Sequence, residues 1–220
     1  MAKITEEGKY REKRGTGTGA NYKPWIKIRE INSVGTATTV IDYKNGREVQ
    51  LLSQGEVWAY YTLRWRDDVE DIREQYPLKR NMVENICDRL GYEYPNHSRT
   101  LMTTDLLVTK TDGSLVAYSV KVNRNVLQKA RTIQLLDIEK MYWEEQGAVF
   151  YMWYKEDANE ILVQNIMDVV ACYDDKSIVD SISALRYKIA HKEIVVDMES
   201  KRLNYEELLD KYRKGELSGK

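Results

Sequence analysis

The sequence predicts an α/β fold that is followed by a small, mostly helical C-terminal domain. In the first part of the chain, strand patterns alternate with helical patterns, which is the order expected of a sheet covered by helices. After about residues 156–159 the chain reads as three helices, so we place a domain boundary there. The composition, 42% hydrophobic and 31% charged, is that of a globular chain with a buried core.

Residues 1–24 are predicted to form a flexible, basic, glycine-rich arm. The stretch "KRGTGTGANYKPW" (13–25) has no hydrophobic period, and we expect it to end at an anchor, Pro24-Trp25. Residues 1–30 hold eight Lys or Arg and four Glu, an excess of four positive charges that could meet phosphates. A solvated tail explains this charge equally well. The cations expected to contact DNA are Arg11, Lys13, Arg14 and Lys23.

Residues 25–158 are predicted to form the catalytic domain, which begins with a β-hairpin and a capped helix. In "TATTVIDYKNGREVQLL" (36–52), β-branched residues flank the turn signal Asn45-Gly46. Ser53 then has the pattern of an N-cap, with Glu56 three residues later as in a capping box. We expect this helix to run to about Trp65.

The rest of this domain alternates strands and helices. A strand over "VEDIREQYPL" (69–78) precedes a helix that should stop at Gly91. Two strands then flank a turn at Asp112-Gly113, and a long amphipathic helix leads to an apolar strand that we expect to be buried. The ranges expected for these later elements are 81–90 and 124–146 for the helices and 106–108, 115–122 and 148–154 for the strands.

Residues 159–220 are predicted to form a small helical domain that docks on a protein partner. We expect helices over 161–173, 178–189 and 205–212, with "EIVVDM" (193–198) as a candidate short strand. The segment carries ten Lys or Arg and twelve Asp or Glu, so its balance of −2 is unfavourable for binding DNA unaided. About sixty residues also bury too little area to be robust alone.

Several classes of protein are disfavoured by the sequence. No apolar run approaches the roughly 18 residues that a membrane span needs, and the N-terminus lacks the apolar core of a signal peptide. Cys87 and Cys172 are far apart, which suggests reduced thiols and a cytoplasmic protein. With only two histidines, a zinc site is improbable, and any metal would be a hard ion on carboxylates.

One pair of neighbouring strands carries the residues for a phosphodiesterase. Asp105 opens the first strand, and Lys121 lies in the second. Hydrolysis of a phosphodiester needs carboxylates to hold Mg²⁺ and a cation to offset charge on the phosphate. Asp105 and the backbone carbonyl of Val120 could hold the ion, Glu56 could add a second carboxylate, and Lys121 could face the attacking water or the phosphate.

The strand pair resembles the PD-(D/E)xK motif of restriction-endonuclease-like nucleases, but in a degenerate form. Thr104 stands where a proline is usual, and Ser119 stands where an acidic residue is usual. A hydroxyl is a weak magnesium ligand, so the sequence leaves the number of metal ions, one or two, open. A simpler interpretation also remains, in which Asp105 caps a turn and Lys121 extends from a sheet edge into solvent.

Several longer stretches resemble one known family. They are "RGTGTGANYKPW", "GREVQLLSQGE", "VEDIREQYPL", "MTTDLLV", "YSVKV" and "RTIQLLDIEKMYWEEQ", which together span about residues 12–160. The sequence is similar to the TnsA endonuclease subunits of Tn-seven-like transposons, including CRISPR-associated ones. These subunits belong to the PD-(D/E)xK, or restriction-endonuclease-like, superfamily.

The resemblance implies a restriction-endonuclease-like core, with a mixed central sheet flanked by helices. The family's catalytic residues correspond to Glu56, Asp105 and Lys121. The implied cofactor is Mg²⁺, one or two ions, with Mn²⁺ as a substitute. Its ligands would be Glu56, Asp105 and the Val120 carbonyl, with Ser119 at most a weak ligand. Glu74 is a candidate extra ligand, although a pair with Arg73 or a backbone turn is the favoured interpretation.

The resemblance also implies partners. Such subunits are metal-dependent DNA endonucleases, a class of hydrolase, and cut the 5′ strands at transposon ends. A TnsB-type DDE transposase cuts and joins the 3′ strands, and a TnsC-type AAA+ ATPase regulates both in the bacterial cytoplasm. The family's C-terminal part is winged-helix-like, and the version here is short. The alternatives are a catalytically weak or dead adaptor of the transposase complex and a stand-alone restriction or repair nuclease.

Overall fold

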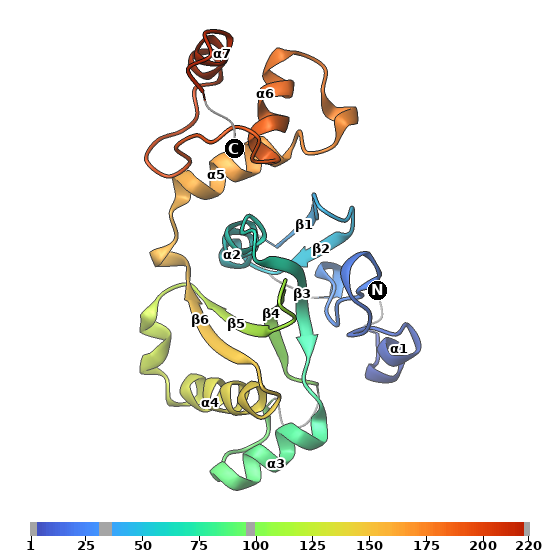
Figure 1. Ribbon diagram of the computed structural model, residues 1–220. Helices are drawn as coiled ribbons and strands as arrows, with labels where there is room; N and C mark the ends of the chain where they lie inside the picture. Colours follow the sequence, from blue (N-terminus) through green and yellow to red (C-terminus); the bar gives the residue numbers. More distant parts are fainter. Residues whose placement is uncertain (1–3, 31–36, 96–99, 218–220) are drawn as a thin grey trace. The chain divides into compact units, whose positions relative to one another are not determined.

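The computed structural model describes residues 4–30, 37–95 and 100–217. The chain divides into two compact units, which we describe separately (Figure 1). The first comprises residues 1–41 and 47–157, and the second comprises residues 42–46 and 158–220. Among the described residues, every helix is too short or too polar to cross a membrane.

A four-stranded mixed sheet forms the centre of the first unit, with the order β3-β4-β5-β6. Strands β3 (Val69–Pro77), β4 (Thr103–Lys110) and β5 (Leu115–Lys121) are antiparallel neighbours, whereas β6 (Val149–Tyr154) is parallel to β5. A parallel pair needs a long crossover, and helix α4 (Ala130–Glu145) supplies it. The predicted α/β fold with a mixed central sheet is confirmed.

Helices cover this sheet and close its core. Helix α3 (Arg80–Leu90) and α4 pack on the central strands through a buried apolar cluster. Helix α3 ends as expected at Gly91, which has a φ of 66° and the left-handed cap conformation. The cluster includes Leu78, Val83, Ile86, Cys87, Leu107, Ala117, Ile138, Tyr142 and Trp143.

The β-hairpin expected near the start of the domain is present. Strands β1 (Thr38–Ile41) and β2 (Glu48–Leu51) pair antiparallel, with Ile41 opposite Glu48. The connecting loop is closed by a hydrogen bond from the Gly46 N–H to the Asp42 carbonyl at 2.7 Å. Strand β2 leads directly to Ser53, which caps helix α2 (Gln54–Arg64) as predicted.

The prediction of a flexible arm over residues 1–24 is wrong for the part that the structure describes. Residues Glu6–Arg11 form helix α1, and Tyr22 is buried with its hydroxyl donating to the Glu74 carbonyl at 2.9 Å. Gly15 lets the backbone of this segment pack closely against Pro77. Gly15 has a φ of +71°, and a Cβ there would lie 2.2 Å from Pro77 Cγ.

Three smaller expectations are also corrected. Strand β6 is not buried: it is the sheet edge, so one side has no neighbouring strand, and Val149 and Tyr151 are half exposed. Helix α4 begins at Ala130, because residues Arg124–Gln128 form a 3-10 turn. The stretch 193–198 is not a strand, since its backbone continues from the α6 cap as irregular chain.

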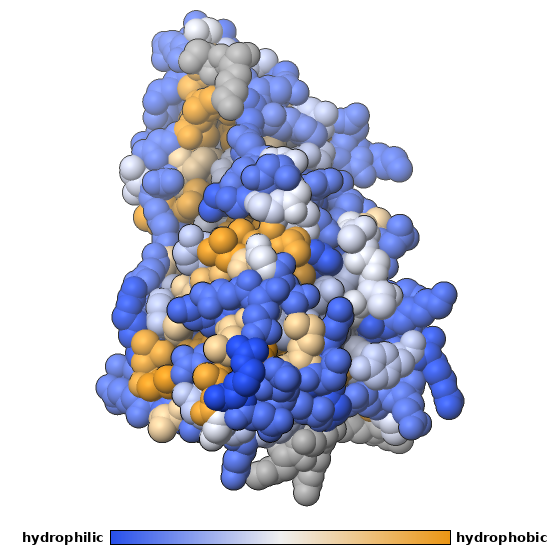
Figure 2. Space-filling view, turned by 60° about the horizontal axis from the view of Figure 1, so that its bottom comes forward, coloured by the Kyte–Doolittle hydropathy of each residue, from blue (hydrophilic) through white to orange (hydrophobic). Residues whose placement is uncertain are grey.

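The surface of the molecule is mostly polar. Figure 2 shows one face on which hydrophobic areas interrupt a largely hydrophilic surface. The large exposed hydrophobic side chains of the first unit include Val122, Ile133 and Val149. Single exposed hydrophobic residues are normal on folded proteins, so they identify no binding surface by themselves.

The second unit is helical, and its three expected helices are present. They are α5 (Glu160–Val170), α6 (Ser181–Ala190) and α7 (Tyr205–Arg213). Asn165 is buried and organises the unit, because its amide nitrogen donates to the Met198 and Lys201 carbonyls at 2.9 and 2.8 Å. Residues 158–217 contain no β-strand in the structure, so the wing of a winged helix is not found in the part described.

Candidate active site

Two neighbouring strands bring Asp105 and Lys121 together. Asp105 lies in β4 and Lys121 ends β5, and Lys121 Nζ is 3.6 Å from Asp105 Oδ2. The same Oδ2 accepts a hydrogen bond from the Val120 N–H at 2.7 Å, which fixes the carboxylate. Both side chains are about a quarter exposed, so this pair is accessible from solvent.

Glu56 is held in place by the cap of helix α2. Its Oε1 accepts from the Ser53 hydroxyl at 3.0 Å, and its Oε2 accepts from the Leu52 N–H at 2.9 Å. The Gln75 amide donates to the same Oε2 at 3.0 Å. Gln75 has a φ of +49°, an uncommon conformation for a residue with a side chain, so the backbone of β3 is strained where it contributes this donor.

A third carboxylate, Glu139, comes from helix α4 and was missed by the sequence analysis. It is 4% exposed, and the hydroxyls of Thr104 and Ser119 interact with it and lower its pKa. Thr104 Oγ1 also accepts from the Trp143 indole at 2.6 Å, and Ser119 Oγ accepts from Lys121 Nζ at 2.8 Å. Each hydroxyl therefore accepts one hydrogen bond, and its own O–H remains available as a donor.

The sequence did hold a signal for Glu139. Thr104 and Ser119 are the two positions at which the chain departs from the nuclease motif, and both present their hydroxyls to this carboxylate. Helical periodicity identifies residue 139 as part of a buried face, but a charged residue on a buried face needs polar partners. The two unusual hydroxyl residues are those partners.

The three carboxyl groups have raised pKa values. Burial, followed by the charge of Asp105, raises the pKa of Glu56 to about 8. The same two causes raise the pKa of Glu139 to about 7, although the hydroxyls of Thr104 and Ser119 lower it. Burial also raises the pKa of Asp105, against the opposing effect of Lys121. The groups share negative charge that one ammonium does not balance.

The donor atoms fit a hard divalent cation. They are oxygens only, from Glu56, Asp105 and the Val120 carbonyl, which is the ligand type that Mg²⁺ prefers. Buried Glu139 Oε1 has no hydrogen-bond partner in the structure, so the cluster has unused acceptor capacity. Within the described residues, no three acidic, His or Cys side chains converge as a ready-made metal cage. Water and phosphate oxygens would have to complete the coordination.

Two candidate residues from the sequence analysis lie elsewhere. Glu74 is fully buried and is bound by both guanidinium nitrogens of Arg47, each at 2.8 Å, so it is a structural ion pair and not an extra metal ligand. Arg73, its expected partner, instead donates to Thr109 at 2.9 Å. Arg14 is 2% exposed and is paired with Glu12 and Glu30, so its guanidinium is part of the fold, and its role in DNA binding stays a prediction.

The other cations expected to meet DNA are on the surface. Arg11, Lys13 and Lys23 are exposed, and Lys23 Nζ makes a long contact of 3.4 Å to the Glu12 carbonyl. Their role in DNA binding stays a prediction.

Comparison with known proteins finds two similarities. Residues 66–154 match the model of the TnsA-like endonuclease N-terminal domain. This part of the chain is TnsA-like. The chain is also 31% identical over 159 residues to the transposon Tn7 transposition protein TnsA of Escherichia coli. That alignment covers 71% of this chain but 58% of the relative, so the chain spans less than two thirds of that protein's length. The match to the TnsA-like domain includes Asp105, Lys121 and Glu139, whereas Glu56 precedes it.

Proposed function

We propose that this protein is a metal-dependent DNA endonuclease that cuts the 5′ strands at transposon ends. The observation that carries the proposal is the interaction of Glu56 with Asp105, whose ion pair with Lys121 lies within the segment that matches the TnsA-like domain. Glu56 is 49 positions before Asp105, and Asp105 is 16 positions before Lys121, so the fold brings together residues that are distant in sequence. Such an arrangement of two carboxylates and a lysine supports phosphodiester hydrolysis.

Glu56, Asp105 and the Val120 carbonyl would hold Mg²⁺, and Mn²⁺ could substitute. The ion would lower the pKa of a bound water and neutralise charge on the scissile phosphate. The Val120 N–H fixes the Asp105 carboxylate, and the helix cap fixes Glu56, so neither group has to reorganise when DNA arrives. We propose one ion on Asp105 and the Val120 carbonyl, with Glu56 holding a second.

Lys121 would offset charge at the phosphate or hold the attacking water. Its Nζ donates to Ser119 Oγ at 2.8 Å and to the Val120 carbonyl at 3.1 Å, which aligns it toward the carboxylates. The Ser119 hydroxyl is a weak ligand for a magnesium ion, so it does not replace the acidic residue that the motif usually has at this position. Glu139, next to the Ser119 hydroxyl, supplies the missing negative charge and so acts as a positioning residue for Lys121.

We propose that the protein works with a TnsB-type transposase and a TnsC-type ATPase. The relative that supports this is named as a transposition protein. Residues 159–220 would dock on the ATPase, because their charge of −2 (ten basic and twelve acidic residues) disfavours DNA. Ile178 and Val179, which are 37% and 83% exposed, are apolar surface that a protein partner could cover.

A strand-specific nicking assay tests the proposal. Transposon-end DNA from the element that carries this gene is labelled on each 5′ strand and incubated with the protein, the transposase and the ATPase. We expect 5′-strand cuts with Mg²⁺ or Mn²⁺ and none with EDTA. Metal-independent cutting, or cuts confined to the 3′ strands, would rule the proposed function out.

A further inference from the structure

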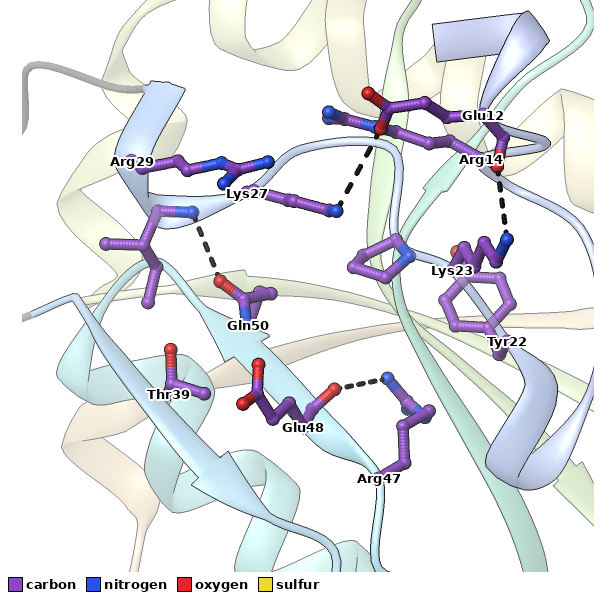
Figure 3. A pocket seen from close by; sticks show the side chains of 12 residues that line it. Glu12, Arg14, Tyr22, Lys23, Lys27, Arg29, Thr39, Arg47, Glu48 and Gln50 are labelled. Atoms are coloured by element: carbon purple, nitrogen blue, oxygen red, sulfur yellow. Dashed lines mark hydrogen bonds and ion pairs between the residues drawn. The ribbon is translucent and has the colours of Figure 1, made fainter.

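The first unit contains an open groove that is separate from the carboxylate cluster. It encloses about 690 Å³ and lies between the segment after helix α1 and the β1–β2 hairpin (Figure 3). Five cationic side chains line it: Arg14, Lys23, Lys27, Arg29 and Arg47. Figure 3 shows Lys27 and Arg29 on one side of the groove and Arg47 with Glu48 on the other.

Some of these cations are already paired within the fold. Arg14 binds Glu12 at 2.8 Å and Glu30 at 2.6 Å, and Arg47 binds buried Glu74. These two guanidiniums are therefore part of the framework of the groove. Their ion pairs fix these two guanidiniums in the wall of the groove.

The other three cations, Lys23, Lys27 and Arg29, make few polar contacts within the fold. Lys27 Nζ is 4.0 Å from a Glu12 carboxylate oxygen, at the limit of an ion pair. Within the described part of the chain, the one polar contact of Lys23 Nζ is with the Glu12 backbone carbonyl. Arg29 makes no hydrogen bond or ion pair with any residue that the structure describes. A ligand with several acceptor oxygens could therefore recruit all three at little cost.

A buried donor in the same wall lacks a partner. Arg14 is 2% exposed, yet its Nη2 has no hydrogen-bond acceptor among the residues that the structure describes. A buried charged donor without an acceptor costs free energy, because it has lost its hydrogen bonds to water. An anionic oxygen in the groove would remove that cost, so this atom indicates an anion rather than an apolar ligand.

We propose that this groove binds a phosphodiester group of the DNA backbone, at a point away from the bond that is cut. This inference rests on the proposed function, because a DNA endonuclease is the setting in which the groove would meet phosphates. Guanidinium and ammonium groups together match the several oxygens of a phosphate. The carboxylates of Glu12 and Glu48 limit the site to one or two phosphates, since they would repel a longer run of negative charge.

The groove is connected to the candidate active site through strand β2. Gln50 lines the groove, and its backbone N–H donates to Glu74 at 3.0 Å. Two residues later the Leu52 N–H donates to Glu56. A phosphate bound in the groove would therefore contact the same strand that positions the proposed catalytic carboxylate of Glu56. This contact would help to position the DNA relative to that carboxylate.

The test measures binding of a fluorescein-labelled DNA duplex of unrelated sequence by the full chain, in EDTA, over about 20 to 200 mM salt. The double variant Lys27→Gln/Arg29→Gln should bind several-fold more weakly, and the slope of log K against log salt should fall by roughly 1 to 2. Glu48→Gln should bind a few-fold more tightly. Lys140→Gln/Lys211→Gln removes two exposed, paired lysines elsewhere and is the charge-matched control.

Unchanged affinity and salt slope in Lys27→Gln/Arg29→Gln would overturn the proposal, as would equal losses in the control. Binding of a glutamate-rich peptide that depends on Lys27 and Arg29, with DNA binding unaffected, would overturn it in favour of a protein ligand. Because the measurement needs no cleavage, it separates the two proposals. A protein that binds DNA through the groove but never cuts would refute the proposed function and support the groove.

Discussion

Glu139 is the residue that most changes the picture of the site. The nuclease motif usually has an acidic residue two positions before the lysine, and here that position is Ser119. The structure places a buried carboxylate from helix α4 beside the Ser119 hydroxyl instead. The site therefore still contains an acidic side chain, although it comes from residue 139 and not from position 119.

The first prediction concerns this carboxylate. Glu139→Gln should reduce 5′-strand cutting by about 10- to 100-fold, because Lys121 loses the charge that orients it through Ser119. Since the pKa of Glu139 is raised to about 7, wild-type activity should rise through neutral pH, and the variant should lack that rise. Glu144→Gln, on the exposed side of the same helix, is the control. Identical pH profiles for wild type and Glu139→Gln would exclude a positioning role.

The second prediction concerns stability and pH. The raised folded-state pKa values, about 8 for Glu56 and about 7 for Glu139, mean that the folded protein holds protons that the unfolded chain has already lost. Stability of the metal-free protein should therefore fall as pH rises from about 5 to 8, by several kcal/mol. Urea unfolding in EDTA measures this. Glu56→Gln/Glu139→Gln should flatten the dependence, and stability that increases over this range would contradict the assignment.

At the scale of elements, the capped helix and the paired strands were predictable from local sequence. Ser53 and Glu56 have the capping-box spacing, and Glu56 of that box is also the proposed catalytic carboxylate. Asp105 and Lys121 meet because antiparallel neighbours bring their ends together. Glu139 could not be placed in this way, because periodicity shows which face of a helix is buried but not what lies opposite.

The N-terminal segment was misinterpreted for a related reason. A glycine-rich segment can be flexible, or its backbone can pack closely against neighbouring residues, and composition does not distinguish the two. Here Gly15 passes so close to Pro77 that no side chain would fit. The apolar sequence of β6 predicts a buried strand, but only the strand order shows that β6 is an edge.

The third prediction tests the packed segment. Gly15→Ala should destabilise the protein by about 1–3 kcal/mol, because a Cβ meets Pro77 Cγ at 2.2 Å and φ is +71°. Gly19→Ala is the matched control, since its φ is also positive at +53° but a Cβ would meet nothing within 4 Å. Urea midpoints compare the two. Equal, small effects would mean that residues 13–24 do not pack in solution as described.

At the scale of the whole molecule, the chain joins a TnsA-like unit to a helical unit. The two are linked twice, because residues 42–46 of the hairpin loop group with the C-terminal unit. Tyr43 in that loop contacts Tyr173, with ring centroids 4.9 Å apart. The sequence indicated the boundary near residue 157, but the second link joins residues distant in sequence and has no local signal.

The fourth prediction concerns the product of the complete reaction. If this protein cuts only the 5′ strands, Lys121→Ala should leave 3′-end joining by the partner transposase intact. The element then stays attached to its donor, and insertion products should shift from simple insertions to cointegrates. Long-read sequencing of insertion products gives the ratio. A ratio unchanged from wild type would contradict this division of labour.

The central claim is that Glu56, Asp105 and Lys121 form the site that cuts DNA, and Asp105→Asn tests it most directly. The amide keeps the size of the side chain but removes the charge that would bind the metal ion. Purified Asp105→Asn protein is compared with wild type in the strand-specific nicking assay with Mg²⁺, after its unfolding midpoint shows that it is folded. We predict that 5′-strand cutting falls below detection while 3′-strand cutting by the partner is kept. Cutting of the 5′ strand at the wild-type rate would contradict the account.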